Sequence, residues 1–266
     1  MTRDSTIPYL YSRRKEGWLL RFEGSRIANM KIVIPMAGKG TRFKEGGIQT
    51  PKMLVPVLGL PMLFWALKNL PKNYDDYIFI GLARQIRDYK LDRVLKTVVS
   101  EDIHIASIEE PTEGQACTVL GIRSFIDNEE PLLIHNIDTY FECDLGWLSD
   151  KTIDGAVPYF ESDDPNMSFL RMGEDHAVLE VAEKKPISTH ATVGLYFFRR
   201  GCDFVWGAER MIRNNRKVRN EFYIGPVYNE LISRGDHILG IRAKTAWDLG
   251  TPEKVKLFER NFADAN

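Results

Sequence analysis

The chain has 266 residues, of which 44% are hydrophobic and 27% charged, and its net charge at pH 7 is −1. This is the composition of a globular protein with enough apolar residues for one large domain or two small ones. The balanced charge provides no overall field that would attract nucleic acid or an anionic membrane. We therefore expect no nucleic-acid partner and no membrane partner.

The cysteines and histidines favour no metal or disulfide site. Cys117, Cys143 and Cys202 lie far apart without CxxC spacing, and the five histidines form no HExxH motif. This pattern argues against a disulfide framework and against a cysteine zinc site. No apolar run reaches the length of a membrane span, and the N-terminus lacks the continuous apolar segment of a signal peptide. These features predict a reducing, cytoplasmic compartment.

Residues 1–29 differ in composition from the rest of the chain. They contain six Lys or Arg residues against three Asp or Glu residues, and their apolar residues follow no clear period. The stretch GWLLRFEG at residues 17–24 could form a short strand against the domain or a neighbour, and Met30 offers an alternative start. We interpret residues 1–29 as an N-terminal appendage without a functional role of its own and residues 30–266 as the domain that carries the function.

From Lys31 onward, strand-like and helix-like patterns alternate. This order predicts a parallel sheet with crossover helices on both faces. The predicted elements are a strand at 31–37, a helix at 61–70, a strand at 76–83, a helix at 85–99, a strand at 102–108, a helix at 114–126 and a strand at 131–138.

The pattern changes after residue 154, where strand-like runs follow one another with few helices between them. Such runs predict a mixed or antiparallel extension of the sheet. We therefore expect an α/β fold that is Rossmann-like (GT-A-like), with a mixed, mainly parallel central sheet flanked by helices. The predicted elements are strands at 155–161, 168–173, 177–184 and 192–200, helices at 202–215 and 222–235, a last strand at 237–243 and a closing helix at 251–263.

The first strand is followed by a glycine-rich and basic stretch. Gly38 and Gly40 let the backbone approach a ligand and expose its N–H groups, which suits phosphate oxygens. Arg42 adds a planar fork of hydrogen-bond donors, and Lys52, directly after Pro51, adds a second positive charge. The stretch is neither a Walker A loop nor a dinucleotide fingerprint. The alternative is a loop that needs positive φ angles for structural reasons alone.

These residues carry a resemblance to a known family. The motif MAGKGTRF…TPKMLVPVLGLPML resembles the N-terminal motif of sugar-1-phosphate nucleotidyltransferases, G-x-G-x-R followed by P-K and P-V-x-G-x-P-M. These enzymes join a nucleoside triphosphate to a sugar 1-phosphate and release pyrophosphate. The resemblance implies that Arg42 and Lys52 are catalytic. It also implies that the loop binds the nucleotide through Ala37, Gly38, Gly40 and Thr41.

The segment EEPTEGQACTVL, residues 109–120, resembles the base-binding segment of the same family. There, a loop before a helix contacts the nucleobase, which assigns nucleotide binding to Gly114 and Gln115. An amide side chain both donates and accepts, as the edge of a base requires. The structural alternative is a helix N-terminus with Thr112 as N-cap, and the two interpretations are compatible.

Two aspartates resemble the metal-binding positions of the family. Asp138 ends a buried strand in LLIHNIDTYF, and Asp248 precedes the closing helix in AWDLGTPEKV. Two carboxylates suit Mg²⁺, which takes its remaining ligands from phosphates and water. The alternatives are a turn residue for Asp138 and a capping or turn residue for Asp248. Thr251 is the predicted N-cap of the closing helix, and Pro252 its first residue.

The acceptor site is implied by three further segments of the resemblance. VLEVAEKKPIS matches the family's E-K-P segment, so that Glu183 would contact sugar hydroxyls and Lys184, rather than Lys185, the sugar phosphate. The alternative is a solvated charge cluster. Gly194 would let the sugar lie against the backbone, and Glu221 is the polar residue expected to face the sugar. Tyr223 and Tyr228 are equally consistent with core positions.

The implied function is Mg²⁺-dependent synthesis of an NDP-sugar, of the kind used in capsule and lipopolysaccharide pathways. The partners would be a nucleoside triphosphate and a phosphorylated small-molecule acceptor. The first alternative is a cytidylyltransferase acting on phosphocholine or another non-sugar phosphate. A GT-A glycosyltransferase is disfavoured by the absence of D-x-D, and a non-catalytic regulatory subunit by the presence of every motif. A homo-oligomer contact through Trp18 stays open.

Overall fold

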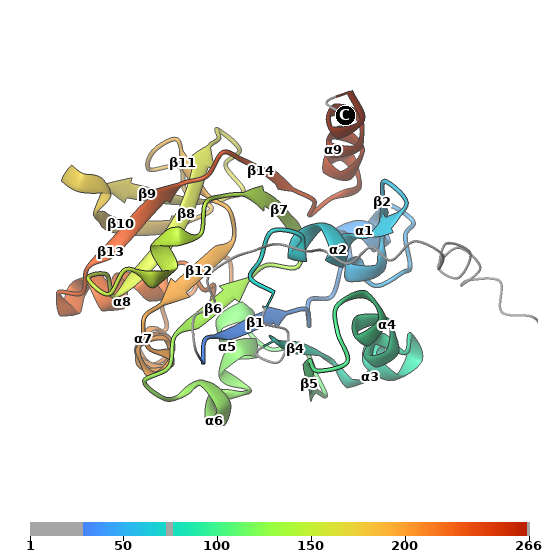
Figure 1. The fold of residues 1–266 in the computed structure, drawn as a ribbon, viewed down its shortest axis with the longest axis horizontal. Coiled ribbons are helices and arrows are strands. Elements are labelled where there is room, and N and C mark those ends of the chain that lie inside the picture. Colours follow the sequence, from blue (N-terminus) through green and yellow to red (C-terminus); the bar gives the residue numbers. More distant parts are fainter. Residues whose placement is uncertain (1–28, 73–76, 265–266) are drawn as a thin grey trace, which may run out of the picture.

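The first apolar run forms the centre of the fold. In the computed structural model, which describes residues 29–72 and 77–264, Lys31–Pro35 is strand β1 (Figure 1). Its successive side chains point to opposite faces of the sheet and are buried on both. Val33 packs into one apolar core, whereas Ile32 and Ile34 pack into another. A strand buried on both faces needs helices on both, which is the arrangement that the alternating pattern predicts.

The main sheet is mixed, and its strands follow the order β10-β9-β11-β8-β12-β6-β1-β4-β5, with β13 beside β8. The strands β6, β1, β4 and β5 run parallel, whereas β12, β11, β9 and β10 extend the sheet with antiparallel pairs. The predicted α/β fold with a mixed central sheet is thereby confirmed. The remaining strands are β4 (Tyr77–Leu82), β5 (His104–Ile108), β6 (Leu132–His135), β8 (Gly155–Glu161), β9 (Ser168–Met172), β10 (Val178–Glu183), β11 (His190–Thr192), β12 (Leu195–Phe198) and β13 (Ile238–Arg242).

Helices cover both faces of this sheet (Figure 1). One face packs against α5, α6, α7 and α8, and the other against α2 and α4. Burying both faces removes a large apolar area from water and is the main source of stability. The helices are α2 (Met62–Leu67), α3 (Ala83–Asp88), α4 (Leu91–Val98), α5 (Gln115–Leu120), α6 (Arg123–Ile126), α7 (Gly201–Arg213) and α8 (Val227–Arg234), with 3-10 turns at Gly146–Ser149 and Glu174–His176.

A third apolar cluster lies beside the sheet and joins the beginning of the domain to its end. Phe43, Trp65, Tyr140 and Phe258 are buried in it. Figure 1 shows α9 beyond β14, on the same side of the molecule as α1 and α2. The elements that build it are α2 together with α1 (Thr41–Glu45), β2 (Pro56–Val57), β3 (Leu60–Pro61), β7 (Thr139–Glu142), β14 (Thr245–Asp248) and α9 (Pro252–Asp264). A 3-10 turn, η1, at Lys52–Leu54 precedes β2.

Several boundaries differ from the sequence prediction for local backbone reasons. The helix predicted at 85–99 is two helices, because Lys90 adopts a left-handed conformation with φ 51°. The helix predicted at 114–126 is also two, since α5 ends at Leu120 and α6 begins at Arg123. The strand predicted at 192–200 is interrupted at Gly194, where φ is 71°. Each of the two pairs of helices packs into a common core, so the apolar pattern continues across the break.

Other differences concern elements that the sequence prediction placed wrongly or omitted. The helix predicted at 222–235 begins only at Val227, after Gly225 and Pro226. The strand at 237–243 is not the last, because β14 follows it and pairs with β7. The stretch after β1, expected as an open loop, forms the short helix α1 from Thr41. Thr251 accepts a hydrogen bond from the Lys254 N–H, so its predicted capping role is confirmed. The strand expected at residues 17–24 lies outside the described residues.

None of the helices formed by residues 29–72 and 77–264 combines the length and the apolar character that a membrane span requires.

His135, at the end of β6, is the fully buried histidine of the sheet. Its Nδ1 lies 3.1 Å from the Gly194 carbonyl oxygen and its Nε2 lies 3.1 Å from the Thr139 carbonyl oxygen. A neutral imidazole has one N–H and can donate to only one of them. Burial lowers the pKa of His135 to about 4, although both carbonyl contacts oppose this shift.

This pKa predicts an acid-sensitive component of stability. Between an unfolded-state pKa of about 6.5 and the folded value, the unfolded chain takes up a proton that the folded protein excludes. The stability is therefore present above pH 6.5 and is lost as the pH falls towards 4. From pH 7 to pH 5 we expect His135 to account for a loss of about 2 kcal/mol in the free energy of unfolding. Urea unfolding at both pH values should show a smaller loss for His135→Gln, and an identical loss in both proteins would contradict the assignment.

Candidate active site

The candidate site lies where the direction of the sheet topology reverses. Strand β1 pairs with β4 on one side and with β6 on the other, and all three are parallel. Their carboxyl ends therefore meet at one edge, and the chain leaves β1 and β6 in different directions. A crevice at such a switch point is the usual ligand site of open α/β sheets. The glycine-rich stretch follows β1, and Asp138 follows β6.

The glycine-rich stretch presents accessible backbone at this edge. No atom lies within 4 Å of the place that a Cβ would take at Gly38 or at Gly40, and Gly40 has φ 64°. Ala37 is buried and holds the start of the stretch, whereas Thr41 and Arg42 are exposed in the first turn of α1. The first N–H groups of a helix have no partner within it. The stretch can therefore offer donors to an anion, as expected from the sequence.

Lys52 and Asp138 form an ion pair at this edge of the sheet. Lys52 begins the 3-10 turn η1, and its Nζ donates a hydrogen bond to Asp138 Oδ2. Their side chains are 23% and 21% exposed. Burial alone would raise the pKa of the Asp138 carboxyl, but the Lys52 ammonium outweighs it and holds this pKa below its usual value. Asp138 is therefore an anion at neutral pH and can serve as a ligand.

The unpredicted pair β7–β14 brings Asp138 and Asp248 together. Thr139 is the register partner of Asp248, and the Leu249 N–H donates to the Asp138 carbonyl oxygen at 2.7 Å. A Cβ placed on Gly250 would lie 2.7 Å from Asp248 Oδ1 and 3.3 Å from Asp138 Oδ2. It would also lie 3.5 Å from an Arg42 guanidinium nitrogen, Nη1. Three predicted site residues thus converge on the space beside Gly250, namely Arg42, Asp138 and Asp248.

Lys254 and Asp164 join this group, although the sequence analysis did not identify them. Lys254 Nζ donates to Asp248 Oδ2 at 2.5 Å and to Asp164 Oδ2 at 2.6 Å. Burial alone would lower the pKa of Lys254, but the two carboxylates outweigh it and raise the pKa. Lys254 follows Asp248 by six residues on the next helix, a spacing that could have drawn attention to it. Asp164 lies in a loop with no motif.

The two carboxylates fit a magnesium ion better than a transition metal. Within residues 29–72 and 77–264, no group of three or more His, Cys, Asp or Glu side chains is placed to hold a metal. Mg²⁺ commonly uses one or two carboxylates and takes its other ligands from substrate phosphates and water. Asp138 and Asp248 offer such a pair of hard oxygen ligands beside the glycine-rich stretch. The donor set therefore fits a magnesium ion that binds together with a phosphorylated substrate.

The predicted acceptor residues form a second cluster at the end of β10. Lys184 turns the chain with φ 52°, and its Nζ donates to the Tyr223 hydroxyl and lies 4.2 Å from the centre of its ring. The Tyr223 hydroxyl in turn donates to Glu221. Lys185 is exposed and takes no part. Burial lowers the pKa of Lys184 and raises that of Glu183 beside it.

Positive charges from other segments act on Lys184. Burial is the main cause that lowers its pKa, and the Arg42 guanidinium adds to this effect. Arg219, which the sequence analysis missed, donates to Asn166 Oδ1 at 3.4 Å and adds positive charge beside Lys184. A single Arg in the basic run at 213–219 carries no motif, so only the fold could identify it.

The segment predicted to bind the base is fixed by main-chain hydrogen bonds against the segment predicted to bind the acceptor. The Ala116 N–H donates to the Phe222 carbonyl oxygen at 3.0 Å, and the Phe222 N–H donates to Glu113 at 2.8 Å. Gly114 has φ 133°, and a Cβ there would lie 2.4 Å from the Phe222 oxygen. Helix α5 begins after Gly114, so Thr112 is not its N-cap. Instead, the Thr112 hydroxyl donates to the Gly114 carbonyl oxygen.

Gln115 and Gly194 meet at Asn136, which the sequence analysis did not single out. Gln115 Nε2 donates to Asn136 Oδ1 at 3.1 Å. The space that a Cβ would take at Gly194 is filled by the Asn136 amide, whose Nδ2 would lie 2.6 Å away. Gly194 is therefore required for the close approach of Asn136. The roles of Gln115 in base binding and of Gly194 in sugar binding stay predictions.

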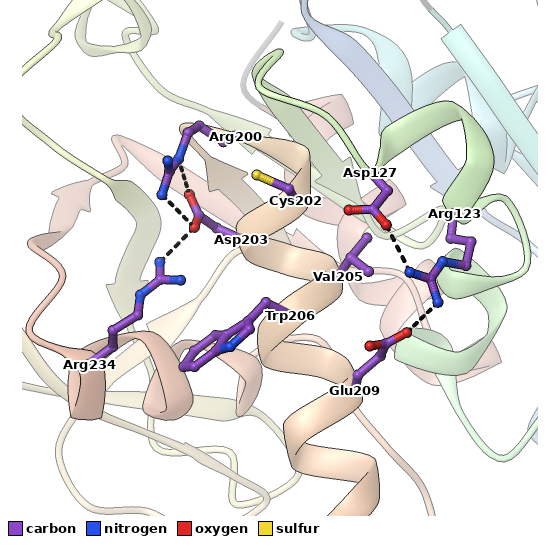
Figure 2. Close-up of a pocket in the computed structure, with 9 residues that line it drawn as sticks. All are labelled: Arg123, Asp127, Arg200, Cys202, Asp203, Val205, Trp206, Glu209 and Arg234. Atoms are coloured by element: carbon purple, nitrogen blue, oxygen red, sulfur yellow. Dashed lines mark hydrogen bonds and ion pairs between the residues drawn. The ribbon is translucent and has the colours of Figure 1, made fainter.

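A shallow hollow of about 360 Å³ lies elsewhere, over α6, α7 and α8 (Figure 2). It is lined by Arg123, Arg200 and Arg234, and each of these arginines is paired with a carboxylate, as the dashed lines show. Helix α7 begins directly after β12, whose end pairs with the start of β6 at Leu132. This hollow is therefore at the opposite edge of the sheet from Asp138 and offers no unpaired arginine to an anion.

The chain is similar to known proteins over most of its length. No family model matches the chain. The bifunctional protein GlmU of Aquifex aeolicus is 27% identical over 262 residues, which cover 85% of this chain and 53% of the relative. The chain spans about half the length of the curated relatives it matches.

Solved structures extend the similarity to the fold. A nucleoside-diphosphate-sugar pyrophosphorylase from Vibrio cholerae RC9 is 28% identical with a TM-score of 0.76, over 86% of this chain and 99% of that one. A UDP-glucose pyrophosphorylase complexed with UDP-glucose shares the fold, with a TM-score of 0.69 at 18% identity, over 89% of this chain and 99% of that one. These similarities confirm the resemblance to the sugar-1-phosphate nucleotidyltransferase family.

Two glycines of the site provide a matched test of its geometry. Gly114→Ala would force a Cβ into the Phe222 backbone at a φ that other residues rarely adopt, so we expect it to lower the free energy of unfolding by about 3 kcal/mol or more. Gly38→Ala meets open space and should cost less than about 1 kcal/mol. Urea unfolding measures both, and equal losses would contradict the close contact between residues 114 and 222.

Proposed function

We propose that the chain is a Mg²⁺-dependent nucleotidyltransferase that joins a nucleoside triphosphate to a sugar 1-phosphate and releases pyrophosphate. The observation that carries this proposal is the convergence of Arg42, Asp138 and Asp248 on Gly250, at the carboxyl edge of the sheet. Cations and metal-binding carboxylates at one point suit a reaction between two phosphates. The similarity to GlmU and to the Vibrio cholerae pyrophosphorylase supports the same class of reaction.

The proposed reaction is an in-line displacement at phosphorus. A phosphate oxygen of the acceptor forms a bond to the α-phosphorus, while the bond from that phosphorus to the oxygen bridging it to the β-phosphorus breaks. Pyrophosphate leaves with the electron pair of the broken bond. The nucleophile is already an anion, so the reaction needs no general base. The protein has to bring two anions together and stabilise the charge that develops at phosphorus.

The charged residues of the site suit these tasks. The open backbone at Gly38 and Gly40 and the Arg42 fork would hold the β- and γ-phosphates. Lys52 would stabilise the α-phosphate, and Lys184 would bind the acceptor phosphate. Asp138 and Asp248 would hold the magnesium ion, which when bound neutralises phosphate charge. The Lys52–Asp138 pair supports these assignments, because it holds both side chains at the carboxyl edge of the sheet.

The acceptor cluster favours a sugar over choline. Glu183 and Glu221 lie beside Lys184, and carboxylates are good acceptors for hydroxyl groups. Recognition of a quaternary ammonium uses a cage of aromatic faces. Tyr223 is the aromatic residue found with Lys184, which already covers its face.

The tryptophans of the described residues are committed elsewhere. Trp65 and Trp247 pack against Phe258, Trp147 packs against Phe197, and Trp206 lies under Arg234 in the hollow of Figure 2. None of these four can line a choline cage at the acceptor site without leaving its present partner. Phosphocholine therefore stays the second candidate, and a sugar 1-phosphate the first.

We also propose that the NDP-sugar product serves surface polysaccharide synthesis, as in capsule and lipopolysaccharide pathways. An enzyme that consumes nucleoside triphosphates needs access to their pool, which supports the expected cytoplasmic location.

A matrix assay tests the proposed function. Each of ATP, CTP, GTP, UTP and dTTP is mixed with Mg²⁺ and one acceptor from a panel of hexose 1-phosphates, heptose 1-phosphates and phosphocholine. Mass spectrometry then detects any nucleoside-diphosphate conjugate. A conjugate with a sugar 1-phosphate supports the proposal and identifies base and sugar together. A product only with phosphocholine would replace the acceptor, and no triphosphate binding at all would contradict the proposal.

Substitution of Arg42 and Lys52, the two cations proposed to contact the triphosphate, can be compared with substitution of a nearby control residue, Lys44. Arg42→Ala and Lys52→Met should each reduce kcat at least about 100-fold, because they remove positive charge where negative charge develops. Lys44→Met changes an exposed cation on the same short helix and should keep kcat within about threefold. Thermal unfolding checks that all three variants are folded. Near wild-type turnover of Lys52→Met would remove Lys52 from the mechanism.

The metal ligands are tested by their dependence on Mg²⁺. Asp138→Asn keeps the shape of the side chain but loses its charge, so we expect the Mg²⁺-dependent turnover to fall at least about 100-fold. Steady-state rates measured over a Mg²⁺ titration check this. A variant with an unchanged Mg²⁺ dependence would exclude Asp138 as a ligand.

A further inference from the structure

Lys254 is an unusual residue for its position. It lies in the first turn of α9, where the helix dipole disfavours a cation. The side chain is compensated by two carboxylates, since its Nζ donates to Asp248 Oδ2 at 2.5 Å and to Asp164 Oδ2 at 2.6 Å. The three side chains are only 23–28% exposed. A partly buried cation at an unfavourable helix position points to a role beyond helix stability.

Both proposed metal ligands are neutralised by lysines from other segments. Asp138 is paired with Lys52, and Asp248 with Lys254. The second oxygen of Asp248 accepts a hydrogen bond from the Gly250 N–H at 2.7 Å. A divalent cation that binds Asp248 therefore has to share this carboxylate with Lys254 or displace the lysine. Displacement is opposed by the attraction between the two charges in a partly buried setting.

Asp164 provides a second carboxylate partner for Lys254. A partly buried ammonium that loses its only partner is costly, but Lys254 keeps Asp164 when Asp248 is taken by a metal. Asp164 belongs to the loop between β8 and β9, which is anchored independently of the metal ligands. Asn166 in this loop accepts a hydrogen bond from Arg219, and Met167 accepts one from the Lys184 N–H.

We propose that Lys254 is a positioning residue that holds Asp248 in the free protein and withdraws onto Asp164 when a divalent cation binds. The cation then binds weakly by itself and tightly only together with a nucleoside triphosphate, whose phosphates supply further ligands and further attraction. This inference rests on the proposed function only in taking Asp138 and Asp248 as the metal ligands.

Manganese binding to the full chain without any nucleotide tests the proposal. Electron paramagnetic resonance measures the free Mn²⁺, and hence the Kd. We expect Lys254→Met to bind Mn²⁺ at least tenfold more tightly than the unmodified protein. Asp164→Asn should bind it at least threefold more weakly, since Lys254 loses its second partner. Lys256→Met and Asp163→Asn change exposed neighbours of the same sign and should leave the Kd unchanged.

The double variant separates positioning from simple charge. If Asp164 acts through Lys254, Asp164→Asn should have no effect in the Lys254→Met background. An equal weakening in both backgrounds would overturn the proposal, because a through-space charge effect does not need the lysine. An unchanged or weaker Mn²⁺ affinity of Lys254→Met, or no Mn²⁺ binding by any variant, would overturn it as well.

The result does not depend on turnover. The predicted pattern of Mn²⁺ affinities in a protein that makes no conjugate would uphold the lysine's role and reject the proposed reaction. An active enzyme without this pattern of Mn²⁺ affinities would uphold the proposed reaction and reject the role of Lys254.

Discussion

The site depends on holding two carboxylates of like charge next to each other at the edge of the sheet. The pairing of β7 with β14 places Asp248 beside the chain that follows Asp138. Two like charges close together in a partly buried setting repel each other, so the arrangement needs compensation. Lys52 and Lys254 supply it from two distant segments. The third apolar cluster, which buries Phe43, Tyr140 and Phe258, holds these segments in place.

The same constraint explains why the beginning and the end of the domain meet. The glycine-rich stretch leads into α1, Lys52 lies on η1, and Lys254 lies on α9. All three elements border the cluster that joins α1, β7 and α9, so packing that looks remote from the chemistry positions its cations. Main-chain contacts also join the segments predicted to bind the base and the acceptor. Main-chain bonds between residues 113–116 and Phe222 tie α5 to the chain that carries Glu221 and Tyr223.

Much of the fold and part of the site could be predicted from the sequence. The alternating apolar runs gave the order of strands and helices, and strands such as β1 and β6 lie where they were expected. The glycine-rich motif and the two aspartates led to the same edge of the sheet, because motifs at strand ends have a place that the topology determines. The position next to Glu183 favours Lys184 over Lys185, and in the structure Lys184 contacts Tyr223 whereas Lys185 is exposed.

The remaining features depend on contacts between distant segments. β7 and β14 have four residues each and no pattern stronger than their neighbours, so only their pairing identifies them. Lys254, Asp164 and Arg219 are single charged residues in ordinary polar stretches, and nothing local distinguishes them from solvated side chains. Asn136 contacts Gln115 and the backbone at Gly194. These residues lie far apart in the sequence, so only the fold shows that they meet. At Lys90 and Gly194, a positive φ angle interrupts an element that the sequence predicts as continuous. The spacing of apolar residues does not reveal such a backbone conformation.

The central claim is that a metal-bound triphosphate lies between Asp138, Asp248 and the glycine-rich stretch. The most direct measurement is a crystal structure with Mn²⁺ and a triphosphate analogue with a methylene group between the α- and β-phosphorus atoms. Anomalous scattering then locates the manganese. The account predicts a manganese peak shared by the two carboxylates, with the α-phosphate beside Lys52 and the terminal phosphates at Gly38–Arg42. A manganese ion and triphosphate bound elsewhere, or a triphosphate bound without contact to either aspartate, would contradict it.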